Sequence, residues 1–267
     1  MARYAKLLKY ELKTILHDPM NAFMLFYPFL MLFIMGWLLP AILDRSGAAS
    51  NARTITLLIG FVVAIALGGY MMGALLGFSL IENKDEKTLW SIAVTPVTVA
   101  GYAWFKTAYA FVFAIFGNLV MTAGMKLLFA EAYTVEYGGI AVGLFDSLSY
   151  GELVVFSVVA SLIVPAVGAV FAGVAKNKIE GFAFVKTGAI VVMIPILALL
   201  DSLQGWKQYF LGLAPNFWPV KALLNVALSS SNAADLSFWW YMAIGAVYPI
   251  ALGMWAMDAF IRKSGLK

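Results

Sequence analysis

Six stretches of this chain are long and apolar enough to cross a lipid bilayer, and they constrain the fold more than any other feature. The hydrocarbon core of a bilayer is about 30 Å thick, which an α-helix spans with about 20 residues. The chain is 63% hydrophobic and only 12% charged, about half the charged share of a soluble domain. The sequence therefore predicts an all-α integral membrane protein, with residues 1–267 forming a single transmembrane domain. The expected transmembrane helices are 21–43, 54–80, 107–128, 153–175, 184–203 and 238–261.

The chain lacks the residues and motifs that several kinds of chemistry require. The chain has no cysteine and a single histidine, His17, which excludes disulfides, thiolate ligands and a histidine metal cluster. No phosphate-binding motif of the form G-x-x-x-x-G-K-[ST] occurs, so the chain should not hydrolyse nucleotide by itself. We expect no catalytic residue, metal or cofactor on this chain. The net charge of +4 is better explained by membrane orientation than by nucleic-acid binding.

The first 18 residues are predicted to form an amphipathic helix at the membrane interface. At about 100° per residue, apolar residues occupy one side of the helix and basic residues the opposite side. Glu11 is the one charged residue on the apolar side. The basic side would face anionic head groups, with Lys6, Lys9 and Lys13 as interfacial anchors. Asp18-Pro19 would end this helix and cap the first transmembrane helix. A helix packed on a soluble partner is the alternative.

One long polar insertion, 82–106, separates two transmembrane segments. Its charged start is too polar to enter lipid. Leu89, Ile92 and Ala93 have helical spacing, which predicts a short amphipathic helix from Ile81 to Ala93 that Thr95-Pro96 closes. An ordinary solvated loop is the alternative.

This segment resembles the corresponding segment of the permease subunits of ABC-2 type exporters. Matching positions are occupied by Asp85, Thr88, Leu89, Thr95, Pro96, Val97 and Lys106, whereas Lys87 and Trp90 depart from the family pattern. The resemblance implies that 82–97 is a coupling helix that docks into a groove of a separate ATPase subunit. The residues implied in this contact are Asp85, Glu86, Thr88, Leu89, Trp90, Ile92, Thr95 and Pro96.

The resemblance also implies a function for the whole chain. It would be the permease subunit of an ATP-driven exporter, paired with an identical or sister permease and with ATPase chains that hold ATP and magnesium. The substrate would be hydrophobic or amphiphilic, such as a drug, lipid or peptide. A secondary transporter or channel without an ATPase is the main alternative, and an intramembrane enzyme or a scaffold are two others.

Lysine and arginine are concentrated in the segments on the side that holds the N-terminus. Positively charged loops of membrane proteins stay in the cytoplasm. We therefore predict a protein of the plasma membrane in which both termini and the 82–106 segment face the cytoplasm. The short basic segment 176–186 would be a loop on the same side.

The segment 204–237 is apolar but is interrupted by Gly212, Pro215 and Pro219. Neither half is long enough to cross the membrane, which predicts a re-entrant hairpin of two short helices on the outer face. Aromatic residues would form a belt there, and contact with an amphiphilic substrate or a gate is the alternative. The aromatic residues concerned are Trp206, Tyr209, Phe217 and Trp218, of which Trp206, Phe217 and Trp218 are the candidate substrate contacts.

Small residues mark one of the spans, and prolines mark three others. Gly69, Gly73 and Gly77 recur every four residues, a pattern that lets helices approach closely. The contact could lie within one subunit or between two. Proline residues near the middle of later spans predict kinks. These prolines are Pro165, Pro195 and Pro249.

Overall fold

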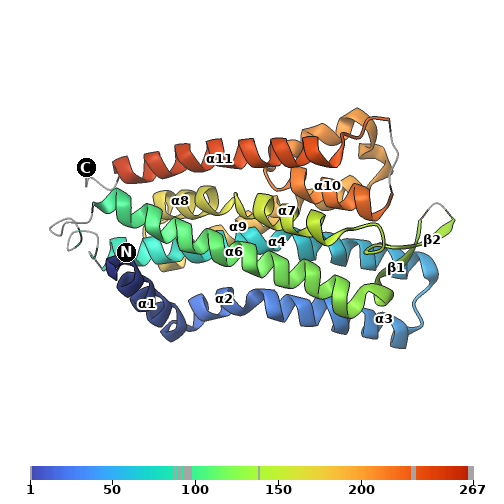
Figure 1. Ribbon diagram of the computed structural model, residues 1–267, viewed down its shortest axis with the longest axis horizontal. Helices are drawn as coiled ribbons and strands as arrows, with labels where there is room; N and C mark the ends of the chain where they lie inside the picture. The colour runs from blue at the N-terminus through green and yellow to red at the C-terminus, as the bar shows by residue number, and fades with distance from the viewer. Residues whose placement is uncertain are drawn as a thin grey trace.

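The computed structural model describes residues 2–86, 88, 92, 98–137, 139–229 and 233–263, which form an elongated bundle of helices (Figure 1). Helix α1 and the last turns of α11 lie at one end of the bundle, and the strands and α10 lie at the other. In chain order, the elements are α1 (Ala2–His17), α2 (Pro19–Met31), the π-helical η1 (Leu32–Leu38), α3 (Leu39–Ser46), α4 (Ser50–Asp85), α6 (Val99–Phe129), η2 (Ala130–Tyr133), β1 (Thr134–Tyr137), β2 (Ile140–Gly143), α7 (Tyr150–Ser161), α8 (Val164–Val174), α9 (Lys178–Val192), η3 (Ile194–Leu199), η4 (Asp201–Leu203), η5 (Gly205–Leu213), α10 (Phe217–Ala227) and α11 (Phe238–Lys263).

Six helical stretches in the described residues are long and apolar enough to span a membrane, which confirms the predicted all-α transmembrane fold. They are Pro19–Ser46, Ser50–Asp85, Val99–Tyr133, Tyr150–Val174, Lys178–Leu199 and Phe238–Lys263. The second and third are longer than predicted, because helix continues through polar residues at their ends. Asn83 of α4 and Lys106 of α6 are both buried and hydrogen-bonded, so their polarity does not end the helices.

The glycine stripe on α4 packs against α7 and α8 of the same chain. A Cβ atom on Gly69 would lie 2.4 Å from the carbonyl oxygen of Ala160, and one on Gly73 would lie 2.6 Å from Cβ of Val167. Such distances show that only a hydrogen atom fits at these positions. The stripe therefore forms a contact within the subunit, which answers the question that its spacing left open.

The three mid-span prolines have different local effects. Pro165 lies in the first turn of α8, after a short break that separates α8 from α7. Pro195 lies at the start of η3, where α9 changes into a 3-10 helix, because proline cannot donate the next helical hydrogen bond. Pro249 lies inside α11, which continues past it.

A small antiparallel hairpin between α6 and α7 was absent from the sequence prediction. Strand β1 pairs with β2 in the register Thr134↔Gly143 to Tyr137↔Ile140. It is fixed to the start of α4, because Ser50 donates a hydrogen bond to Glu136 at 2.5 Å and Arg53 donates one to the carbonyl of Thr134 at 3.2 Å. Two four-residue strands give too short an alternating pattern to be recognised in a hydrophobic sequence.

Candidate functional site: the polar end of the bundle

The predicted coupling helix does not begin at Ile81. Helix α4 continues without a break to Asp85, and Ile81 is fully buried in the bundle. The charges at 82–86 suggested an exit from the membrane, but a helix can continue through them because Asn83 is buried and Glu82 is paired. The predicted start at Ile81 is therefore wrong.

The predicted ATPase-contact residues are described only in part. Asp85 and Glu86 are exposed at the end of α4, and Thr88 and Ile92 are helical and half-buried. Ile92 packs against Val99 and Tyr102 at the start of α6. The remaining predicted contacts lie outside the described residues, so their role stays a prediction. These are Leu89, Trp90, Thr95 and Pro96.

A buried ion pair joins α1 to α6 at this end. The carboxylate of Glu11 lies 3.0 Å from Nζ of Lys106, and the two side chains are only 4% and 2% exposed. The hydroxyl of Tyr102 donates to Oε1 of Glu11 at 2.5 Å, and the hydroxyl of Tyr109 donates to Oε2 at 3.2 Å. Removing two charges from water is costly, so a buried pair persists only where further hydrogen bonds satisfy both groups.

The same network reaches α4. Nζ of Lys106 donates to the hydroxyl of Ser79 at 2.6 Å, and Nδ2 of Asn83 donates to the hydroxyl of Tyr102 at 3.2 Å. We call Glu11, Ser79, Asn83, Tyr102, Lys106 and Tyr109 the Glu11 network. It fixes α1, α4 and α6 to one another, and Tyr102 also contacts Ile92 of the predicted coupling segment. The sequence contained one indication of the Glu11 network, because Glu11 is the residue that interrupts the apolar side of α1.

The turn between α1 and α2 is held as the sequence predicted. The carboxylate of Asp18 accepts from the amides of Met20 at 2.9 Å and Asn21 at 3.2 Å, which makes it the N-cap of α2, with Pro19 in the first turn. Lys178 of α9 joins this turn to α4, since its ammonium lies 2.8 Å from both Asp18 and Glu82.

The position of Lys178 corrects another prediction. Residues 176–186 were expected to form a loop, but α9 begins at Lys178, because the side chain of Asn177 caps the amide of Glu180 at 2.9 Å. Burial alone would raise the pKa of Asp18. Hydrogen bonds from Lys178 and from the Asn21 amide outweigh burial and hold that pKa below its ordinary value.

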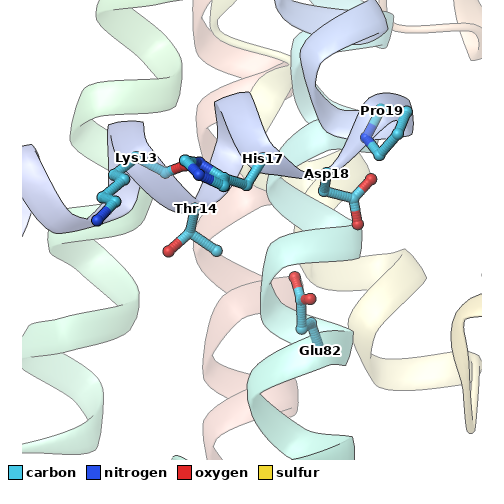
Figure 2. A pocket seen from close by; sticks show the side chains of 6 residues that line it. All are labelled: Lys13, Thr14, His17, Asp18, Pro19 and Glu82. Carbon is cyan, nitrogen blue, oxygen red and sulfur yellow. The ribbon is translucent and has the colours of Figure 1, made fainter.

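A pocket lies between this turn and the end of α4, with a volume of about 520 Å³. We call it the elbow pocket, and Figure 2 shows its six lining residues, five from the chain segment 13–19 and Glu82 from α4. Of the predicted interfacial anchors, Lys13 lines this pocket and Lys9 is exposed elsewhere on α1. Lys6 lies in α1, but its side chain is outside the described part of the chain. The lining residues are Lys13, Thr14, His17, Asp18, Pro19 and Glu82.

At the opposite end, two helical segments, η5 and α10, occupy the predicted hairpin. Trp206 is 66% exposed, and Trp218 is half-buried between Tyr209 and Tyr241. Phe217 is fully buried, so the prediction that it faces lipid or substrate is wrong for this conformation. The sequence of an apolar hairpin does not show which of its aromatic rings packs inward.

This end also holds a buried ion pair that the sequence did not reveal. Nζ of Lys221 lies 3.5 Å from the carboxylate of Asp235, and both side chains are almost fully buried. Nε2 of Gln208 donates to the same carboxylate at 2.9 Å. These contacts fix the segment before α11 to α10 and η5. In the described residues, no cluster of His, Asp and Glu is arranged to hold a metal ion.

Comparison with known proteins gives a family and two relatives. Residues 11–257 match a family model described as "Fluoroquinolones export permease protein Rv2686c-like". Fluoroquinolones export permease protein Rv2686c of Mycobacterium tuberculosis strain ATCC 25618 / H37Rv is 28% identical over 187 residues, which is 69% of this chain. Protein MT2760 of strain CDC 1551 / Oshkosh, which has the same description, matches to the same extent. The match spans 64% of the length of these relatives. No solved structure matches the chain significantly.

Proposed function

The chain belongs to the Rv2686c-like family of fluoroquinolone export permeases, and from this premise we propose that it is the membrane-spanning subunit of an ATP-driven exporter. It moves a hydrophobic or amphiphilic substrate out of the cytoplasm, and a separate ATPase supplies the energy. The family match over 11–257 is the observation that carries the proposal.

Fluoroquinolones are the first substrate class to test, because the names of both relatives specify them. A bundle with six apolar spans suits a substrate that is itself partly apolar. Lipids and other hydrophobic drugs or peptides belong to the same broad class.

The polar end of the bundle is where we place the ATPase. Its support is the motif from Asp85 to Pro96, together with the contact between Ile92 and the first turn of α6. A movement imposed on this segment by an ATPase would reach Tyr102 directly and, through it, the Glu11 network. ATP and magnesium would bind only on the ATPase, and a second permease subunit, identical or sister, would complete the pathway.

Reconstitution tests the proposal. The chain is inserted into vesicles together with the ABC-type ATPase encoded nearest to its gene, and uptake of a fluorescent fluoroquinolone into inside-out vesicles is followed. We expect uptake that requires ATP and is lost when the phosphate-binding lysine of the ATPase is replaced by alanine. Equal uptake by the chain alone, driven by an ion gradient, would show a secondary transporter instead.

The buried Glu11–Lys106 pair is an observation that could favour this alternative, because ion-coupled transporters use ionisable residues within their spans. Its geometry favours a structural role. Both charges are paired with each other and hydrogen-bonded to neutral groups, and the pair lies at one end of the bundle. A group that exchanges protons during transport needs access to water, and these side chains are at most 4% exposed.

A further inference from the structure

The elbow pocket is lined by charges of both signs, and this limits what it can bind. In Figure 2, Lys13 of α1 lies on one side of His17, and the carboxylates of Asp18 and Glu82 lie on the other. Lys178 lies between the two carboxylates and offsets part of their charge. A simple anion would face the carboxylates, and a simple cation would face Lys13. A ligand with both charges avoids each conflict.

Hydrogen-bonding groups remain available on both walls. Nδ1 of His17 donates to the carbonyl of Lys13 at 2.8 Å, so Nε2 of the neutral ring is an acceptor and offers nothing to an anion. The ammonium of Lys13 is exposed and offers donors to an anion. Oε1 of Glu82 accepts from Lys178, whereas Oε2 has no partner among the residues that the structure describes. The pocket therefore offers donors on the α1 side and an acceptor on the α4 side.

An exposed apolar stripe leads away from the pocket along α2. Phe23, Phe26 and Leu30 follow the pocket residue Pro19 at positions i+4, i+7 and i+11, which is one face of an α-helix. These three side chains are 39% to 55% exposed. A polar pocket that continues into a stripe on a membrane-spanning helix matches an amphiphile, with its head group in the pocket and its chains against α2.

We propose that the elbow pocket binds a phospholipid whose zwitterionic head group ends in a primary ammonium, as in phosphatidylethanolamine. The phosphate lies against Lys13, and the ammonium donates to Glu82. Phosphatidylcholine has the same charges, but its quaternary nitrogen has no N–H group to donate. Phosphatidylglycerol has no cation, so it leaves the carboxylates facing an anion.

This site goes beyond the transport function and does not depend on it. A bound lipid would contact α1, the start of α2 and the end of α4 together, and it would do so beside the Lys178 bridge. The bilayer that surrounds the protein supplies the ligand. Lipid composition would then affect how firmly the α1–α2 turn is held.

The experiment compares lipids that differ only in the head group. The full chain is purified in a mild detergent, titrated with phosphatidylethanolamine, phosphatidylcholine or phosphatidylglycerol of identical chains, and analysed by native mass spectrometry and by thermal unfolding. We expect phosphatidylethanolamine to bind about tenfold more tightly than the other two, the effect of hydrogen bonds to charged groups. It should also raise the Tm the most.

Three variants locate the site. Lys13→Gln should weaken the binding of phosphatidylethanolamine, because it removes the cation that holds the phosphate, and Glu82→Gln should abolish the discrimination against phosphatidylcholine. Lys9→Gln on α1 is the matched control, because this exposed lysine is outside the pocket. Glu82→Gln also weakens the Lys178 bridge, so its unfolding is measured without lipid as well. Lys13→Gln tests the site without removing a salt bridge found in the structure.

Four outcomes would overturn the proposal. The first is equal binding of the three lipids, and the second is tighter binding of phosphatidylglycerol, which would show a purely basic surface. The third is equal loss of affinity in Lys9→Gln and Lys13→Gln, which would place the lipid elsewhere. The fourth is competition by soluble phosphoethanolamine at the affinity of the whole lipid, which would show that the pocket binds a free zwitterion without using the stripe on α2.

Discussion

A carboxylate on the apolar side of an amphipathic helix costs free energy unless it is paired, and Glu11 is paired with one cation and two hydroxyls. Nζ of Lys106 lies 3.0 Å from the carboxylate of Glu11, and the hydroxyls of Tyr102 and Tyr109 both donate to this carboxylate. In a helix that only lies on a membrane, the apolar side faces the lipid, and a carboxylate such as Glu11 would be unfavourable there. The structure supplies the reason, because this side of α1 faces the bundle at Glu11 and Ile15.

Breaking the ion pair from one side should destabilise the protein strongly. Glu11→Gln or Lys106→Met leaves one buried charge without its partner, a change that costs about 3 to 5 kcal/mol. The double variant Glu11→Gln/Lys106→Met should lose less than the two single losses together. Thermal or denaturant unfolding in detergent measures each variant.

Lys9→Gln serves as the control for these variants, because Lys9 is exposed on the same helix as Glu11. It should unfold like the parent. Strictly additive losses in the double variant would show that Glu11 and Lys106 do not depend on each other, which would contradict the pairing.

At the scale of elements, the close approach of α4 to α7 and α8 depends on the absence of side chains. Gly69 faces the backbone of Ala160, which cannot move aside as a flexible side chain could. Gly69→Ala should therefore force the helices apart and cost about 1 to 3 kcal/mol, the usual effect of overpacking. The Tm in detergent measures it.

Gly173 of α8 provides a matched control, since a Cβ atom there would meet nothing within 4 Å. Gly173→Ala should leave stability unchanged or raise it by up to about 1 kcal/mol through helix propensity. If both variants behave alike, the glycine stripe is not a packing contact.

The coupling segment gives a second prediction at this scale. Trp90→Ala and Leu89→Ala should each weaken copurification with the ATPase by about 2 kcal/mol, because binding energy concentrates in a few apolar anchors. The subunit itself should remain folded. Copurification and substrate-stimulated ATP hydrolysis are the measurements.

The control for the coupling segment follows from the structure. Glu82 forms a salt bridge with Lys178 and Asp85 is one of the predicted contacts, so neither is a neutral site, whereas Lys9 is exposed on α1 and outside the predicted contact. Lys9→Gln should have little effect on assembly. Normal assembly and export by both Trp90→Ala and Leu89→Ala would mean that this segment is an ordinary loop.

For the whole molecule, the distribution of Lys and Arg predicts that α1 faces the cytoplasm and that the β-hairpin lies outside. The chain has no cysteine, so single cysteines can be introduced without a background signal. Lys9→Cys should react with a membrane-impermeant reagent only from the cytoplasm. Ile140→Cys, at a position that is 69% exposed, should react only from outside. The reverse pattern would invert the proposed topology.

The sequence was sufficient to predict what depends on local composition. The six spans and the Asp18 cap follow from hydrophobic length and from a side chain beside its own helix, and the structure confirms both. Pairs far apart in the chain could not be predicted, because nothing local connects Glu11 to Lys106 or Lys178 to Asp18. The predicted end of α4 and the predicted start of α9 were wrong for the same reason, since distant partners satisfy the polar residues that suggested loops.

The length of α4 has a mechanical consequence. Its 36 residues form one uninterrupted helix, about 54 Å long at 1.5 Å per residue, which exceeds the thickness of a bilayer. Asp85 lies at one end, and Arg53 holds the β-hairpin near the other. Such a helix acts as a lever: a tilt of about 5° about its midpoint displaces each end by about 2 Å, in opposite directions. A small displacement at the polar end would therefore move the hairpin at the opposite end of the bundle.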